Sequence, residues 1–356
     1  MKSKMKDSED YFLKLLENKV EVKSDNVSPS KKASLYIISA LLNTVIEHIK
    51  EQHWLSKKED TRLGQNTSYE AFINRLVDNE LPSMVFLKSY IISAGLSSIE
   101  NIHIRSLRIE EDILSLIKNS SGEQKKEFLI QALSEMTNHF VFEENSQVGW
   151  SSKEGHRGPC LYRTFDNLDV VLDLHYQLDR DMAVTSVATE RLYERAGVGV
   201  QSGFSTILLA LHETKPKHGA KVIDLGSGYG RVGLVYCLLR DDIEFIGYEF
   251  VPHRVENSNQ SSLALGLDSK LKFITQDLSL TTFIIPSADF YYLYDPFTKK
   301  TYEHVLKRIV KVSKDRIIKV VTKGNAREWL GEVSKLNKWP APKSIDKGNL
   351  CLFSSC

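Results

Sequence analysis

Three alternating glycines directly after a short apolar run carry the clearest chemical signal in this sequence. The run V-I-D-L is followed by Gly226, Gly228 and Gly230, with Ser227 between the first two, and residues 232–239 then form an apolar stretch. Glycine tolerates positive φ and lets another molecule approach the backbone more closely than a Cβ would allow. The pattern therefore predicts a strand, a tight turn and a helix, with a small molecule bound across the turn.

The spacing of these glycines differs from that of a dinucleotide-binding fingerprint. The third glycine of that fingerprint lies three residues after the second, where this chain has Arg231, which we expect to pair with a neighbouring acid. A second nucleotide-binding feature is nevertheless present. Residues 244–250 predict a strand, and Glu249 near its end offers a carboxylate that can accept hydrogen bonds from both ribose hydroxyls of an adenosine.

This ordered set resembles the class I S-adenosylmethionine-dependent methyltransferases. The resemblance covers about residues 190–356 and implies S-adenosylmethionine as the cofactor, with Asp224 and the glycine turn at its methionine end and Glu249 at its ribose. Residues 271–277 predict a third strand. The family contacts adenine at the end of that strand, at positions that Asp277 and Leu278 match here.

The fourth expected strand, residues 289–295, runs into the tetrapeptide Y-D-P-F, which consists of Tyr294, Asp295, Pro296 and Phe297. It resembles the Asn/Asp-Pro-Pro-aromatic signature of amino-group methyltransferases, with one proline instead of two. It is closer to the Y-N-P-F form of a bacterial branch similar to the non-SET histone-lysine, or disruptor-of-silencing, methyltransferases, with Asp295 in place of Asn. The resemblance implies an acceptor site here, in which an acid orients the amine and aromatic walls exclude water. The alternative is an ordinary Asp-Pro turn.

The rest of the C-terminal sequence predicts the strands and the helix that complete the sheet on which these residues lie. Residues 315–323 predict a fifth strand, residues 325–336 a helix, and residues 350–354 a last strand, which is antiparallel in the family that the chain resembles. The expected fold class is α/β, with a Rossmann-like seven-strand methyltransferase sheet and an N-terminal all-helical domain.

Three domains or segments are expected along the chain. Residues 1–140 predict a helical accessory or recognition domain, with one helix over 30–57 and two further helices begun by capping boxes at Thr67 and Ser120. Residues 141–200 predict a connecting segment and cofactor lid, with a strand or hairpin over 168–178. Tyr193 and Glu194 resemble lid residues, although this stretch is equally typical of a glycine-bearing turn between helices. Residues 201–356 form the expected methyltransferase domain.

Composition narrows the class of protein. The 356 residues are 42% hydrophobic and 26% charged, as in ordinary globular chains, and no apolar run reaches the roughly 20 residues of a membrane span. No apolar segment typical of a secretory signal follows the charged N-terminus, and the four cysteines lack paired spacing, so we expect a cytoplasmic protein. No metal-ligand spacing is apparent, and no metal is expected.

Charge is unevenly distributed around a net value of +1. Residues 299–323 hold nine Lys and Arg against Glu303 and Asp315. Such a patch near the expected acceptor site would steer an acidic partner. The simpler interpretation, which we favour, is the solvated face of a helix over residues 302–312, with Val305, Ile309 and Val312 inward.

The leading hypothesis is an S-adenosylmethionine-dependent N-methyltransferase with a protein acceptor, a lysine in particular, selected by the helical domain. A second hypothesis is methylation of a nucleic-acid base, with Phe297 stacking on a flipped base, although the modest basic balance weakens it. A third is a regulatory protein that binds the cofactor without turnover.

Overall fold

A computed structural model shows that the chain folds as two compact units, Met1–Asn167 and Leu168–Cys356. The structure describes residues 2–22, 27–80, 85–146, 163–181, 201–294, 298–324, 326–346 and 348–355. The boundary between the units falls inside the stretch that the sequence predicts to be connecting.

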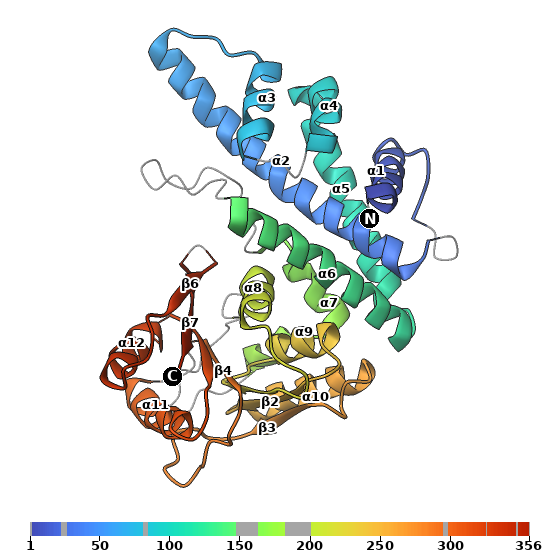
Figure 1. The fold of residues 1–356 in the computed structure, drawn as a ribbon. Coiled ribbons are helices and arrows are strands. Elements are labelled where there is room, and N and C mark those ends of the chain that lie inside the picture. Colours follow the sequence, from blue (N-terminus) through green and yellow to red (C-terminus); the bar gives the residue numbers. More distant parts are fainter. Residues whose placement is uncertain are drawn as a thin grey trace. The chain divides into compact units, whose positions relative to one another are not determined.

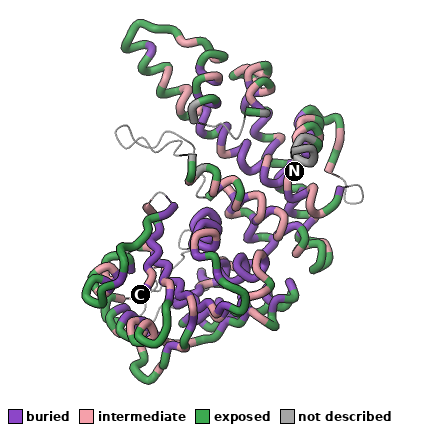
Figure 2. Tube along the Cα trace, in the orientation of Figure 1, coloured by how far each residue is buried: buried purple, intermediate pink, exposed green. Residues whose placement is uncertain are grey.

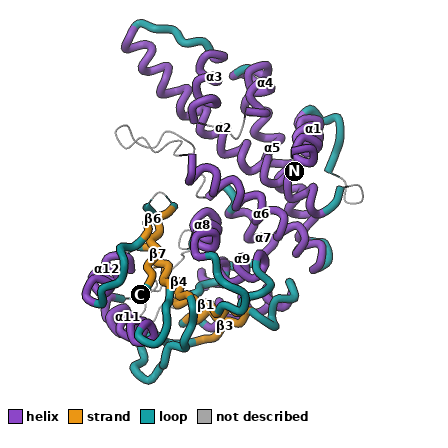
Figure 3. The backbone as a smooth tube through the Cα atoms, viewed as in Figure 1, coloured by secondary structure: helices purple, strands orange, loops and turns teal. Residues whose placement is uncertain are grey.

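The described residues of the first unit form helices and no strands (Figure 3). The helices are α1 (Lys2–Leu16), α2 (Pro29–Leu63), α3 (Tyr69–Glu80), α4 (Val85–Ala94), the short η2 (Leu96–Ser98), α5 (Ile99–Lys118) and α6 (Gly122–Ser146). The long helix α2 packs along both α5 and α6 (Figure 1). The core between them is largely apolar, but Glu110 is buried in it and accepts hydrogen bonds from Asn43 and Asn167. Burial raises the pKa of Glu110, although both amide hydrogen bonds oppose that shift.

Both expected helix starts lie one residue later than predicted. Ser68, not Thr67, accepts the amide of Ala71, because the backbone and hydroxyl of Thr67 donate to Asp60. The second capping box consists of Ser121 and Gln124, each of which accepts the other's backbone amide. The helices themselves are confirmed.

The second unit contains a seven-stranded sheet in the order β3-β2-β1-β4-β5-β7-β6 (Figures 1 and 3). Its strands are β1 (Lys221–Leu225), β2 (Glu244–Glu249), β3 (Leu271–Thr275), β4 (Phe290–Tyr294), β5 (Lys319–Lys323), β6 (Lys343–Ile345) and β7 (Leu350–Ser354). The first five are mutually parallel, and β7 runs antiparallel to both β5 and β6. The predicted fold class, including the antiparallel last strand, is confirmed.

Helices cover both faces of this sheet (Figure 1). They are α8 (Phe204–Thr214), α9 (Arg231–Leu239), α10 (Pro252–Ala264), α11 (Lys299–Ser313) and α12 (Ala326–Leu336). The second unit also contains the short helix α7 (Asp169–Leu172), which packs on α9, and the 3-10 turn η5 (Tyr176–Asp181), while the 3-10 turn η4 (Asp166–Leu168) spans the boundary between the units. One apolar core joins alternate residues of the central strands to α11 and α12, and Figure 2 shows buried residues along those strands. Val305 and Ile309 are fully buried in it and Val312 packs against it, which confirms the predicted inward face of α11.

Three predictions of local structure differ from the fold. Residues 168–178 form helical turns, not a strand or hairpin, because Asp169 and Tyr176 in this stretch both bind the buried Arg231. The fifth strand begins at Lys319, four residues later than predicted, after turns that follow α11. The short strand β6 is not predicted at all, because its residues are mostly polar and it pairs only with β7.

Candidate functional site

The glycine loop joins β1 to α9 at the carboxyl edge of the sheet, where ligands bind in open α/β folds. Gly226, Gly228 and Gly230 have φ values of 94°, 55° and 79°, as the spacing predicts. The loop's own amides are largely engaged within the protein. Those of Gly226 and Ser227 donate to the carbonyl of Tyr248, and that of Gly230 donates to Ser227.

Gly230 is required for packing inside the protein. A Cβ at this position would lie 2.5 Å from the ring of Phe273 and 2.9 Å from the hydroxyl of Ser258. The expectation that a ligand needs this space is therefore wrong for Gly230, because β3 and α10 fill it. The nearest atoms to a Cβ on Gly228 would be those of the side-chain amide of Gln201, at 3.3 Å.

Glu249 ends β2 directly beside the loop and is buried. Its Oε2 accepts the amide of Gly228 at 2.9 Å, and its Oε1 accepts the amide of Val251 at 3.1 Å. Oε1 also lies 3.5 Å from Nη1 of Arg254. An ionised carboxylate has about four lone-pair sites, so each oxygen keeps capacity for a further donor.

Asp224 lies in β1, two residues before Gly226, and only 2% of its surface is exposed. Burial raises the pKa of Asp224 well above its usual value, and the nearby charge of Glu249 raises it further. Within the described part of the chain, no donor forms a hydrogen bond with its carboxylate. A buried acid with an acidic neighbour is costly to ionise, and a cationic ligand would relieve that cost.

The expected adenine contacts follow β3. Oδ1 of Asp277 accepts the amide and the hydroxyl of Ser279 at 2.8 and 2.6 Å, while no described residue donates to Oδ2. The side chain of Leu278 is buried in the apolar core between the sheet and the helices α11 and α12. Ser227, inside the glycine loop, is also buried, and its hydroxyl has no partner among the described residues.

On the expected acceptor side, the structure describes Tyr294 at the end of β4. The ammonium group of Lys323 lies 4.7 Å from the centre of the Tyr294 ring, and the two residues are register partners in β4 and β5. Asp295, Pro296 and Phe297, together with the expected lid residues Tyr193 and Glu194, lie outside the described residues.

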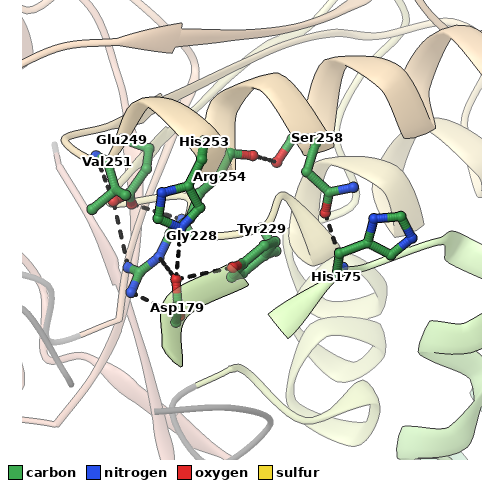
Figure 4. Close-up of polar contacts among 10 residues, drawn as sticks. His175, Asp179, Gly228, Tyr229, Glu249, Val251, His253, Arg254 and Ser258 are labelled. Atoms are coloured by element: carbon green, nitrogen blue, oxygen red, sulfur yellow. Dashed lines mark hydrogen bonds and ion pairs between the residues drawn. The ribbon is translucent and has the colours of Figure 1, made fainter. Parts of the chain in front are cut away.

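Two buried carboxylates near the loop are not predicted from the sequence. Asp169 forms an ion pair with Arg231, which begins α9 and also donates to the carbonyl of Ser202 at 3.0 Å. The expected pairing of Arg231 with an acid is thus confirmed. Asp179 accepts hydrogen bonds from Tyr229, His253 and Arg254 (Figure 4). The sequence signal for both is weak, since an Asp in a short polar turn is usually exposed.

The described residues contain no group of three or more His, Cys, Asp or Glu arranged to hold a metal ion. Nor does any described helix combine the length and apolar character needed to cross a membrane.

No protein-family model matches the sequence, and no curated protein matches it. Solved structures are similar over part of the chain. An RNA methyltransferase from Salinibacter ruber in complex with S-adenosyl-L-homocysteine is 18% identical, with 44% of this chain and 92% of that one covered and a TM-score of 0.34. A TehB-like SAM-dependent methyltransferase from Corynebacterium glutamicum is 14% identical, with 41% and 84% covered and a TM-score of 0.30.

A precorrin 8w decarboxylase from Methanobacterium thermoautotrophicum is 15% identical, with 44% of this chain and 91% of that one covered and a TM-score of 0.33. Likeness at this level transfers no function to this chain. The fold class is established by the order and direction of the seven strands.

Proposed function

We propose that the protein is an S-adenosylmethionine-dependent N-methyltransferase whose cofactor lies across the glycine loop and whose acceptor is a protein lysine. The observation that carries the proposal is the pair of buried acids, Asp224 and Glu249, directly beside a loop of three positive-φ glycines. Each of these features was expected for this cofactor from the sequence, and in the fold they meet at one edge of the sheet.

Charge favours this cofactor over a dinucleotide. S-adenosylmethionine carries a cationic sulfonium and an ammonium group against one carboxylate, whereas a dinucleotide brings an anionic pyrophosphate. Two acids in a buried setting attract the former and repel the latter. The engaged amides of Gly226, Ser227 and Gly230 also leave few donors for a pyrophosphate.

The donor set fits the remaining parts of the cofactor. Each oxygen of Glu249 accepts one backbone amide and can accept a ribose hydroxyl as well, although Oε1 also lies 3.5 Å from Nη1 of Arg254. Oδ2 of Asp277 can accept from the adenine amino group. Bound there, the cofactor supplies a methyl group that its sulfonium activates. The protein's own task is to hold that methyl in line with the acceptor and to exclude water.

On the acceptor side, the proposal assigns the tetrapeptide Y-D-P-F. A lysine with its usual pKa of about 10.4 loses a proton at a cost of roughly 4.6 kcal/mol at pH 7. Asp295 would accept the amine's N–H groups and orient its lone pair, with the aromatic rings of Tyr294 and Phe297 as the walls that exclude water. The rigid Pro296 would fix the turn that presents them.

A second candidate is methylation of a nucleic-acid base, and the surface of α11 favours it. The segment that follows the tetrapeptide comprises α11 and the turn after it. Its exposed lysines are Lys299, Lys300, Lys307, Lys311 and Lys314. A row of cations beside the acceptor side would bind a phosphate backbone. The low net charge of the whole chain, +1, keeps this candidate second.

Transfer of a tritiated methyl group from S-adenosylmethionine into a fractionated cell lysate tests the proposal. With the full chain added, we expect label in protein that is absent when the Glu249→Ala variant replaces it. Label in RNA or DNA instead would favour the second candidate. Cofactor binding without label in any fraction would favour a regulatory protein without turnover.

A further inference from the structure

Two arginines in the first turns of neighbouring helices bind acids from the same upstream segment. Arg231 begins α9 and pairs with Asp169, whereas Arg254 lies in the first turn of α10 and pairs with Asp179. These four side chains are buried. Because α9 follows the glycine loop and α10 follows Glu249, the segment 169–179 is fixed to both halves of the candidate cofactor site.

Asp179 is the more highly connected of the two acids. Its Oδ1 accepts from the hydroxyl of Tyr229 at 2.9 Å, Nε2 of His253 at 2.9 Å and Nε of Arg254 at 3.1 Å, and its Oδ2 accepts from Nη2 of Arg254 at 3.0 Å (Figure 4). Burial alone would raise the pKa of Asp179, but the hydrogen bonds from Arg254 and His253 lower it. The carboxylate is therefore held as an anion with a fixed orientation.

The same arginine reaches Glu249. Nη1 of Arg254 lies 3.5 Å from Oε1 of Glu249, on the side of the guanidinium that Asp179 does not use (Figure 4). Tyr229, the other link, is part of the glycine loop, whose Gly228 amide binds Oε2 of the same glutamate. Asp179 thus constrains the glutamate carboxylate through two independent routes.

From this arrangement we infer that Asp179 and Arg254 are positioning residues that aim the Glu249 carboxylate at the ribose hydroxyls of the cofactor. The inference rests on the proposed function. A buried ion pair contributes little net stability compared with apolar side chains of the same size, because its desolvation is costly. Its particular contribution is geometric, since the planar guanidinium fork fixes two carboxylates at once.

If Asp179 and Arg254 only stabilised the fold, their loss would not change how strongly the protein prefers ribose over 2′-deoxyribose. A pair of ligands that differ in this hydroxyl therefore distinguishes a positioning role from a structural one. Calorimetry on the full chain would compare S-adenosyl-L-homocysteine with its 2′-deoxyribose analogue, for the unaltered protein, Asp179→Asn and Arg254→Lys. The unaltered protein should prefer the ribose form by about tenfold or more, the effect of one charge-assisted hydrogen bond. Both variants should prefer it by less than about threefold, because a misdirected Glu249 gains little from the hydroxyl.

Asp242→Asn provides the matched control. It removes the same charge from an ion pair with Arg240, at the amino end of β2. This variant should keep the full ribose preference. If Asp179→Asn and Arg254→Lys lower overall affinity or melting temperature yet keep that preference, the two residues are structural and the inference is wrong.

Two further outcomes are informative. If either variant fails to fold, Tyr229→Phe takes its place, since it removes one hydrogen bond to Asp179 with little change in volume. It should reduce the ribose preference by about threefold, and an unchanged preference would overturn the inference. If the unaltered protein binds neither ligand, the proposed function itself fails, and the inference fails with it.

Discussion

The backbone amide of Gly228 lies 2.9 Å from Oε2 of Glu249, so a direct hydrogen bond joins the loop after β1 to the residue that closes β2. In this position the carboxylate serves two purposes. It orders the loop, and it retains lone pairs for a ligand at the carboxyl edge of the sheet. Substitutions in the glycine loop or at Glu249 should therefore change both the free energy of unfolding and the affinity for the ligand.

Glu249→Ala should weaken binding of S-adenosyl-L-homocysteine by about tenfold or more, because it removes charge-assisted contacts to the ribose. Glu244→Ala, at the exposed first position of the same strand, should leave the affinity unchanged. Calorimetry measures both. Equal affinity of the two variants would mean that β2 does not end at the ribose.

Gly230→Ala should destabilise the protein more than Gly266→Ala does. Both glycines have positive φ, but a Cβ at position 230 would contact Phe273, whereas nothing lies within 4 Å at position 266. The backbone penalty of about 1–2 kcal/mol applies to both, and overpacking adds about 1–3 kcal/mol at Gly230. Denaturant unfolding measures the difference. Equal losses would show that Phe273 moves aside without cost.

Asp224→Asn should stabilise the ligand-free protein at pH 7 while it weakens cofactor binding. The pKa of Asp224 is raised in the folded chain, so ionisation opposes folding. That penalty is absent below the unfolded pKa of about 3.9 and grows as the pH rises from there toward the folded pKa. The gain in unfolding free energy should therefore shrink as the pH falls toward 4. Exposed Asp268→Asn serves as the control, and a destabilised Asp224→Asn at pH 7 would contradict the account.

Asp295→Ala and Phe297→Ala should each abolish methyl transfer and leave cofactor affinity nearly intact. Orientation and desolvation of the nucleophile matter only while the methyl group moves, so the loss falls on turnover. Asp315→Ala, exposed beyond α11, is the control. Near-normal turnover by both variants on the true acceptor would exclude Y-D-P-F from the active site.

The strands and the glycine loop are predictable because their signals are local. Apolar runs that end at Asp224, Glu249 and Asp277 each lie at or beside the end of a parallel strand, and the three positive-φ glycines occur where the spacing places them. The reason that position 230 must be a glycine is not predictable from the sequence. The ring of Phe273 fills the space that a Cβ of residue 230 would occupy, and Phe273 is 43 residues away in the sequence.

The segment 168–178 shows why local patterns fail. Apolar and polar residues alternate from Leu172 to Leu178, which is typical of a strand with one exposed face. In the fold, Asp169 is buried against Arg231 and Tyr176, and Asn257 of α10 binds the backbone on both sides of Leu174. Partners from distant helices decide this conformation, so neither Asp169 nor Asp179 could be assigned to the site from sequence alone.

Calorimetric titration of the full chain with S-adenosylmethionine, S-adenosyl-L-homocysteine and NAD is the direct test of the assigned cofactor. We expect micromolar binding of both adenosyl ligands, because each presents a ribose and an ammonium group to the acids beside the glycine loop. We expect no measurable binding of NAD. Binding of NAD without binding of either adenosyl ligand would contradict the assigned cofactor and, with it, the proposed methyl transfer.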